Sequence, residues 1–392
     1  MSLFSSLLRL PQRGLVTAAV AARHRLAQTR PRPGRNGGLG RRTPRQAAAG
    51  GAVRVGSGLS LSAFFLFSGD AGKKEEEGEE GKAKEEDPED AIILLLKRAK
   101  LKIMKGELEE AERLLHEASW LSQQSSNNAA IIYTYDMMAN LAFLRGELVK
   151  AEKLFKVTMS YMLAGDVKQD DNAILQMSLK LASIYAAQNQ DKLALAGYQF
   201  CILTLEEKVA KQKEMPAGTL PEEERVNAHL LLAMSMDSYA RYLLAHNQTA
   251  LAQTMYERAL KIAMEVNGER HPQTVVVMND LATALDTQGL YDEAYAQVSR
   301  AAELAQQTQH TDTHVILNNL AGILIHKGDY SQARQVYQTA LEVAEKSGDG
   351  IAVRYITKEL AQLAKRKRVR SRGKTGLQET GAGKDGAEGQ EE

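Results

Sequence analysis

The sequence contains a single cysteine, Cys201, among its 392 residues. One thiol excludes an intrachain disulfide and any zinc or iron–sulfur site built from several cysteines. The fold must therefore be stabilised by packing alone. The redox compartment of the protein stays open on this evidence.

Aromatic residues and proline are also scarce. Phe, Trp and Tyr together make up 5% of the chain and there are eight prolines, whereas hydrophobic residues reach 44%. The interior must be filled largely by Ala, Leu, Ile and Met, most of which favour helices over strands. The composition predicts an all-α protein.

Acidic residues are absent from the first 69 positions, which contain eleven Arg and no Lys. An Arg-rich, acid-poor segment with apolar patches is typical of a mitochondrial presequence, whose positive charge is drawn inward by the membrane potential. We predict that residues 1–54 are such a presequence and are removed. The alternative is a disordered basic tail that binds nucleic acid or acidic partners, although such tails usually contain Lys as well.

Two further segments precede the predicted fold. Residues 55–69 are uncharged and include the cluster Phe64 to Phe67, but 15 residues is short for a membrane span of about 20. They are either a membrane-associated segment or an extension of the presequence, and we favour membrane association because exposed Phe-rich sequence promotes aggregation. Residues 70–90 are rich in Glu and predict a disordered acidic linker.

Beyond Pro88 a spacing typical of helical hairpins occurs six times. Each copy begins with a small residue, and Gly or Asn follows seven residues later. A small central residue comes five residues after that, and a large apolar residue and another small residue follow it. The Gly or Asn favours the left-handed backbone that ends a helix. We expect the central alanines to let paired helices cross closely, and they are Ala111, Ala151, Ala194, Ala252, Ala294 and Ala333.

This pattern resembles the tetratricopeptide repeat family. The resemblance implies a solenoid of about six helical hairpins plus a C-terminal capping helix over residues 91–364. The central alanines lie 40, 43, 58, 42 and 39 residues apart, compared with a usual period of about 34. Each helix should therefore be about one turn longer, as in kinesin light chains, which the run from Gly268 to Pro272 also resembles.

The 58-residue step holds an insertion of roughly 16 residues near 209–224. Because this stretch contains Pro216, Gly218 and Pro221, we predict a loop between the third and fourth hairpins. Residues 351–364 predict the capping helix that a repeat array requires. Residues 365–392 are first basic and then rich in Gly and Glu, which predicts a disordered tail.

Residues with catalytic chemistry are not arranged in a known motif in the repeat region, which lacks a phosphate-binding glycine loop and a metalloprotease helix. His310 and His314 lie one helical turn apart without a third ligand in view, so a turn at a helix start is favoured over a metal site.

Cys201 takes a small-residue position and should be buried and unreactive. Trp120 should pack at the end of the first hairpin. We predict no catalytic residue, cofactor or metal, and hence no enzyme.

A stack of hairpins does offer a concave groove lined by the first helix of each pair. Polar side chains there can hydrogen-bond an extended partner peptide, and the alternative is a polar face without a partner. Counted from the repeat alanines, the groove positions are Asp136, Asn140, Asp237, Arg241, Asn279, Thr283 and Asn318. The Lys and Asn clamp by which chaperone-binding members of the family hold a terminal carboxylate is absent, which disfavours that class of partner.

Helical repeats also bind RNA, which makes RNA binding a competing hypothesis. Residues 70–392 contain 39 basic and 49 acidic side chains, giving a formal charge of −10. Binding to phosphates requires many Lys and Arg contacts, and a basic stripe occurs only at 365–374. The charge therefore argues against nucleic acid as a partner.

The order of presequence, Phe-rich segment and acidic linker is combined with four characteristic runs, at 94–100, 134–143, 180–188 and 268–274. This combination resembles a mitochondrial branch of the tetratricopeptide repeat family over about residues 89–363. The resemblance implies an inner-membrane-associated scaffold that supports assembly or maintenance of respiratory complex III, including handling of its Rieske subunit. The alternatives are a cytosolic cargo or peptide adaptor of kinesin-light-chain type and a helical-repeat RNA binder.

Overall fold

The computed structural model describes residues 87–216 and 218–379, with side chains as far as Lys365. The predicted presequence, the apolar segment 55–69, the linker up to residue 86 and the tail from 380 lie outside these residues. In the described part of the chain there are thirteen α-helices and no strand, which confirms the predicted all-α class.

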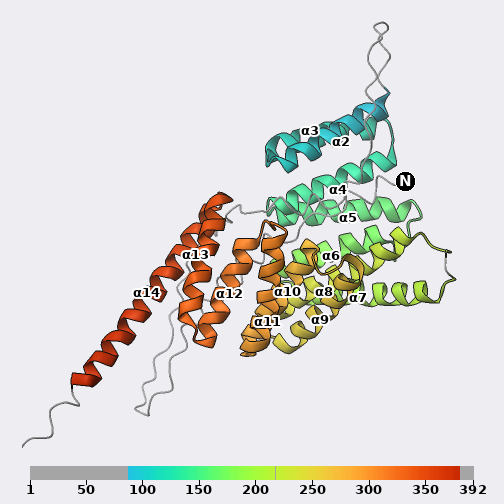
Figure 1. Ribbon diagram of the computed structural model, residues 1–392. Coiled ribbons are helices and arrows are strands. Elements are labelled where there is room, and N and C mark those ends of the chain that lie inside the picture. Colours follow the sequence, from blue (N-terminus) through green and yellow to red (C-terminus); the bar gives the residue numbers. More distant parts are fainter. Residues whose placement is uncertain (1–86, 217, 380–392) are drawn as a thin grey trace, which may run out of the picture. The chain divides into compact units, whose positions relative to one another are not determined.

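The helices fall into two compact units, which are divided between Val266 and Asn267. In each unit, consecutive helices joined by short turns pack as hairpins (Figure 1). The first unit contains α2 (Pro88–Met104), α3 (Leu108–Gln124), α4 (Asn128–Leu144), α5 (Leu148–Ala164), α6 (Asn172–Ala187), α7 (Asp191–Glu214), α8 (Glu222–Ala245) and α9 (Thr249–Asn267). The second contains α10 (Pro272–Gln288), α11 (Tyr291–Gln307), α12 (Thr313–Lys327), α13 (Tyr330–Lys346) and α14 (Gly350–Glu379).

The corner of every predicted hairpin adopts the left-handed backbone that its Gly or Asn was expected to allow. Only Gly, and to a lesser degree Asn, adopts this conformation at little cost, so these residues end the first helix and reverse the chain. The φ angles are +78° at Gly106, +74° at Gly146, +59° at Asn189, +60° at Asn247, +82° at Gly289 and +88° at Gly328.

The six central alanines, from Ala111 to Ala333, are each 0% exposed. Two paired helices approach closely about one turn beyond Ala194, where α7 crosses α6 at Gly197. A Cβ atom placed on Gly197 would lie 2.8 Å from the Cβ of Ala182. Small residues on both helices are thus what permits this crossing.

The start of α10 follows from the run that resembled kinesin light chains. Pro272 occupies the first helical turn, where its missing N–H group costs nothing. His271 caps the helix, because its Nδ1 accepts a 3.2 Å hydrogen bond from the backbone N–H of Gln273.

The insertion near 209–224 is not the loop that we predicted. Helices α7 and α8 each run for 24 residues, so most of the extra sequence lengthens them and only residues 215–221 connect them. Val209 and Gln212 are buried along the extension, which gives the added turns packing of their own. Pro216 and Pro221 stop helix formation only between the two extensions.

Two smaller expectations also fail. Trp120 is 58% exposed, because the buried residues of α3, such as Leu115 and Ala118, lie on the opposite side of the helix. Helix α14 includes the predicted cap 351–364 but continues to Glu379, so residues 365–379 are helical rather than disordered. That stretch contains no proline and is rich in Lys and Arg, which tolerate a helix well.

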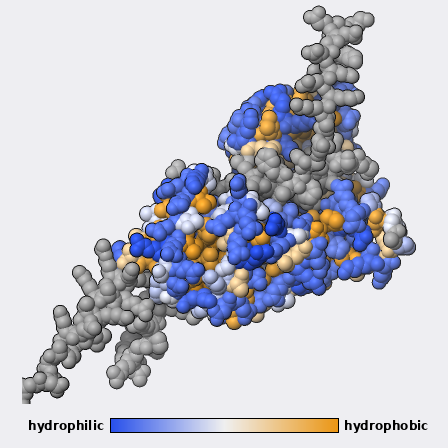
Figure 2. Space-filling model, in the orientation of Figure 1, coloured by the Kyte–Doolittle hydropathy of each residue, from blue (hydrophilic) through white to orange (hydrophobic). Residues whose placement is uncertain are grey.

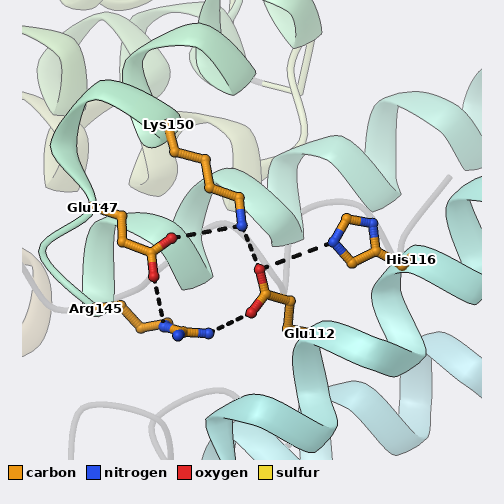
Figure 3. A network of polar contacts seen from close by, with 5 residues as sticks. All are labelled: Glu112, His116, Arg145, Glu147 and Lys150. Atoms are coloured by element: carbon orange, nitrogen blue, oxygen red, sulfur yellow. Dashed lines mark hydrogen bonds and ion pairs between the residues drawn. The ribbon is translucent and has the colours of Figure 1, made fainter.

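A charged network joins the first hairpin to the second (Figure 3). Glu112 on α3 accepts a 2.5 Å hydrogen bond from Arg145 and another from Lys150, and Glu147 also contacts both bases, at 2.8 and 3.5 Å. The hydrogen bond from Lys150 is the largest cause that lowers the pKa of Glu112, and Arg145 lowers this pKa further. Partial burial of the carboxylate opposes both effects. The network therefore stabilises the ionised carboxylate.

The face of the molecule seen in Figure 2 is mostly hydrophilic, with hydrophobic residues in smaller scattered areas. Among the helices of the described residues, none has the length and apolar character needed to cross a bilayer.

Candidate partner-binding surface

The seven predicted groove residues lie on the first helices α4, α8, α10 and α12 and differ in exposure. Four are buried: Asp136 (4% exposed), Asn140 (2%), Asp237 (5%) and Asn279 (6%). Arg241, Thr283 and Asn318 are partly exposed. Their use by a partner peptide stays a prediction, but the buried members have a contact function within the stack.

In the first unit, Asn140 bridges two buried charged residues that come from neighbouring hairpins. Lys180 on α6 donates from Nζ a 2.6 Å hydrogen bond to Asn140 Oδ1. The amide of Asn140 in turn donates to Asp136 Oδ2 at 3.0 Å and to the Asp136 carbonyl at 2.8 Å. Lys180 also lies 5.4 Å from the centre of the Phe155 ring. The polar chain therefore ties α4 to α6 inside the stack.

Burial shifts both charged groups of this chain toward their neutral forms. It raises the pKa of the Asp136 carboxyl, against the attraction of Lys180 and the hydrogen bond from Asn140. It lowers the pKa of the Lys180 ammonium group, against the attraction of Asp136. Since one carboxylate oxygen of Asp136, Oδ1, is buried and accepts no hydrogen bond from the described residues, the carboxylate is under-satisfied.

A second cluster surrounds Arg241 on α8. Its guanidinium is paired with Asp237 one turn earlier, and the two side chains are only 11% and 6% exposed. The rings of Tyr198, Tyr239 and Tyr242 lie 5.5 to 6.3 Å apart on the same part of α7 and α8. The paired guanidinium and the three rings thus lie on neighbouring turns of α8 and on the adjacent α7.

In the second unit, neutral side chains form a similar polar contact between first helices. Asn319 on α12 donates a 2.9 Å hydrogen bond to Asn279 on α10, and Thr283 donates to the Asn279 carbonyl at 3.1 Å. Asn318 directly precedes Asn319 on α12, and its Oδ1 is a buried acceptor that has no hydrogen-bond partner in the described residues.

The sequence analysis missed Lys180 and Asn319, the residues that reach across to the predicted groove positions. Both stand two residues before a repeat alanine, Ala182 and Ala321 respectively. The signal was available in the repeat register, since each follows its partner, Asn140 or Asn279, by 40 residues. A polar residue at this position marks contact between successive first helices.

In the described part of the chain, no three His, Cys, Asp or Glu residues gather in a way that could hold a metal ion. His310 accepts a hydrogen bond from the backbone of Asp312 at 3.0 Å, and His314 is buried near Asp349. Burial raises the pKa of the Cys201 thiol to about 12, which disfavours the reactive thiolate.

Comparison with known proteins agrees with the fold. A family model described as tetratricopeptide repeat matches residues 231–307, and another with the same description matches residues 315–347. The protein named "Tetratricopeptide repeat protein 19, mitochondrial" from Homo sapiens is 51% identical over 313 residues, which cover 79% of this chain and 82% of that protein. This chain belongs to the tetratricopeptide repeat protein 19 family. The family member from Mus musculus is also 51% identical, over 86% of this chain and 91% of its own length.

The tetratricopeptide repeat protein 19 family extends to a more distant homologue from Drosophila melanogaster, 25% identical over 57% of this chain and 58% of that protein. The names of these relatives include the word mitochondrial, which supports a mitochondrial location for this member. Among solved structures, the apo form of RapI has a TM-score of 0.51 at 15% identity, over 71% of this chain and 77% of that chain. That likeness shows the fold alone.

Proposed function

We propose that this chain is a non-catalytic mitochondrial scaffold that supports assembly or maintenance of respiratory complex III, including handling of its Rieske subunit, and that it is associated with the inner membrane. The observation that carries the proposal is the family: this chain is 51% identical to a mitochondrial relative, and it consists of helical hairpins in the described residues. A protein-interaction role suits such hairpins, because the first helices of a repeat array can present side chains to a partner.

The partner surface that we propose is the partly exposed part of the groove. In the first unit it includes the partly exposed side chain of Arg241, and in the second unit it includes those of Thr283 and Asn318. The buried residues Asp136, Asn140 and Asn279 hold successive first helices in register and so position this surface. Inner-membrane association rests on the apolar segment 55–69, which lies outside the described residues.

Affinity purification from mitochondria that have been mapped by protease protection tests this function. We expect the chain to fractionate with mitochondria, to lack its amino terminus and to recover complex III subunits, the Rieske protein among them, after nuclease treatment. Full-length protein in the cytosol would instead support the cargo-adaptor alternative. Recovery that depends on intact RNA would support the RNA-binding alternative.

Substitutions in the groove test the surface itself. Thr283→Ala combined with Asn318→Ala should reduce recovery of the partner without changing the fold. The matched control is Gln297→Ala with Thr339→Ala on the second helices α11 and α13, where Thr339 makes the same backbone hydrogen bond as Thr283. Equal loss of recovery in both variants would place the partner elsewhere.

A further inference from the structure

Helix α2 begins the stack, and its two sides differ sharply. One side is buried against α3 and α4, with Ile92 at 1% exposure and Ala99 at 0%. The side opposite is a surface, since α2 is the first helix of the described residues. In Figure 2 hydrophobic residues interrupt the hydrophilic surface over this first hairpin.

The outer face of α2, as we call it, consists of Leu94, Lys97, Arg98 and Leu101 together with Lys105, which directly follows the last residue of the helix. Leu94 and Leu101 are seven residues apart and therefore lie on one side of the helix, where they are 54% and 49% exposed. The three basic residues are exposed and fall on either side of the leucines. The outer face is thus an apolar stripe flanked by positive charge.

The charges of α2 are segregated along its length. Glu89 and Asp90 stand in the first turn, and all the basic residues follow. The helix dipole favours bases only in the last turn, where Lys102 also forms an ion pair with Glu107 at 2.5 Å. Lys97 and Arg98 lie in the middle of the helix, so the dipole does not account for them.

The end of a repeat array normally carries a polar outer face, which keeps the array soluble. Two exposed leucines flanked by Lys and Arg match instead the surface of a helix that lies on a bilayer. We infer that the outer face of α2 binds an anionic lipid surface. The leucines enter the boundary of the acyl chains, and the long basic side chains reach the phosphates of the headgroups.

A lipid surface is favoured over an acidic protein by the sequence upstream. The apolar segment 55–69 is separated from Pro88 by 18 residues, which span at most about 60 Å when extended. If that segment is held at a membrane, as the proposed function states, α2 stays within reach of the same membrane at a high effective concentration. This inference therefore rests on the proposed inner-membrane association and assigns a second contact to it.

Co-sedimentation of the mature chain with lipid vesicles, without the Arg-rich predicted presequence 1–54, tests the inference. We expect binding to phosphatidylcholine vesicles that contain about a third phosphatidylserine to be roughly tenfold stronger than to phosphatidylcholine alone, and to weaken as salt is raised. Lys97→Glu, Arg98→Glu and Lys105→Glu together should abolish that preference. Leu94→Ser with Leu101→Ser should weaken binding to the anionic vesicles several-fold. Circular dichroism would verify that each variant remains helical.

The matched control is Lys153→Glu, Lys192→Glu and Lys261→Glu, which changes the charge equally at exposed positions of α5, α7 and α9. A second background, Phe64→Ser, Phe65→Ser and Phe67→Ser, removes the apolar cluster while α2 stays intact. The inference requires that the chain without the apolar cluster still bind anionic vesicles more strongly than neutral ones. It also requires that this preference be lost when the three basic residues of the outer face are replaced by Glu. Unchanged binding in the α2 variant, or equal loss in the control, would overturn it.

Recovery of complex III subunits by the same variants separates this inference from the proposed function. If the α2 variant loses vesicle binding and keeps its protein partners, both stand. Loss of a protein partner with unchanged vesicle binding would show that an acidic protein occupies the outer face instead. Absence of complex III from every preparation would refute the proposed function while the vesicle result still decides the role of α2.

Discussion

The Nζ atom of Lys180 lies 2.6 Å from Oδ1 of Asn140, and both side chains are almost completely buried. The two residues belong to first helices of successive hairpins in the first unit. Through Asn140 the lysine is connected to Asp136, so a buried polar chain rather than an apolar contact holds α4 and α6 together at this point. Such a chain specifies register because a shift of either helix would leave buried polar groups unpaired.

Lys180→Met should destabilise the first unit by about 3 kcal/mol, because it leaves Asp136 and Asn140 buried without their partner. Adding Asp136→Leu should recover a substantial part of the loss. Urea unfolding of Lys180→Met, Asp136→Leu and the double variant measures both effects, with Lys192→Met at an exposed position as the control. If the double variant were as unstable as the sum of its single changes, the polar chain would not act as a unit.

Gly197→Ala should destabilise the third hairpin by about 1 to 3 kcal/mol, although alanine is the better helix former. The added Cβ would lie 2.8 Å from the Cβ of Ala182, so α6 and α7 must move apart. Ala182→Gly in the same chain should restore most of the stability by removing that contact. Thermal melts of the single and double variants decide the matter, and a Gly197→Ala variant of increased stability would mean the crossing is looser than described.

Ala294→Leu should overpack the crossing of α10 and α11, where Ala294 is 0% exposed, and cost about 1 to 3 kcal/mol. Ala333→Leu should do the same for α12 and α13. Because each repeat is stabilised by its neighbours, the loss should spread to adjacent hairpins in hydrogen exchange. Ala296→Leu, at an exposed position of α11, should leave the melting temperature nearly unchanged. Equal melting of all three variants would show that the register of the repeats is wrong.

Glu112→Gln should weaken the joint between the first two hairpins by about 1 kcal/mol at neutral pH, since it removes the charge that Arg145 and Lys150 contact. The pKa of Glu112 is lowered in the folded protein, so its contribution is present above the ordinary carboxyl range and is lost as the pH falls through the lowered pKa. The difference in unfolding free energy between wild type and variant should therefore vanish in acid. Urea titrations at pH 7 and below pH 4 would measure it, with Glu109→Gln on the same helix as the control. A difference that persisted in acid would show that the charge is not responsible.

Much of the fold followed from local sequence. The corners at Gly106, Asn189 and Gly328 were predictable because a positive φ angle selects Gly or Asn whatever surrounds it. The first turn of α10 followed from Pro272 for a similarly local reason. The extension of α7 was mispredicted because Pro216 and Pro221 suggested a break throughout the insertion, whereas burial of Val209 stabilises helix up to Glu214.

The candidate site was predictable only in part. Repeat spacing selected Asn140 and Asn279 as groove positions, and both do lie on first helices. Spacing could not show that each would be buried by a contact from the next hairpin, because that contact depends on how far successive helices are offset. The exposure of Trp120 was not predictable for a related reason, since the helices packed against α3 define which of its sides is buried.

By itself, then, the sequence determined the features that arise within one hairpin: where helices end, where small residues permit a crossing, and which segments at the amino terminus carry charge of one sign. Backbone conformation and short-range packing act between residues that are close along the chain, so a linear pattern records them. Only the tertiary structure decided that Lys180 reaches Asn140, that Gly197 meets Ala182 and that Leu94 and Leu101 are exposed in the described part of the chain. Each of these depends on which helix, if any, packs against a given face, and that is settled by contacts between residues far apart in the chain.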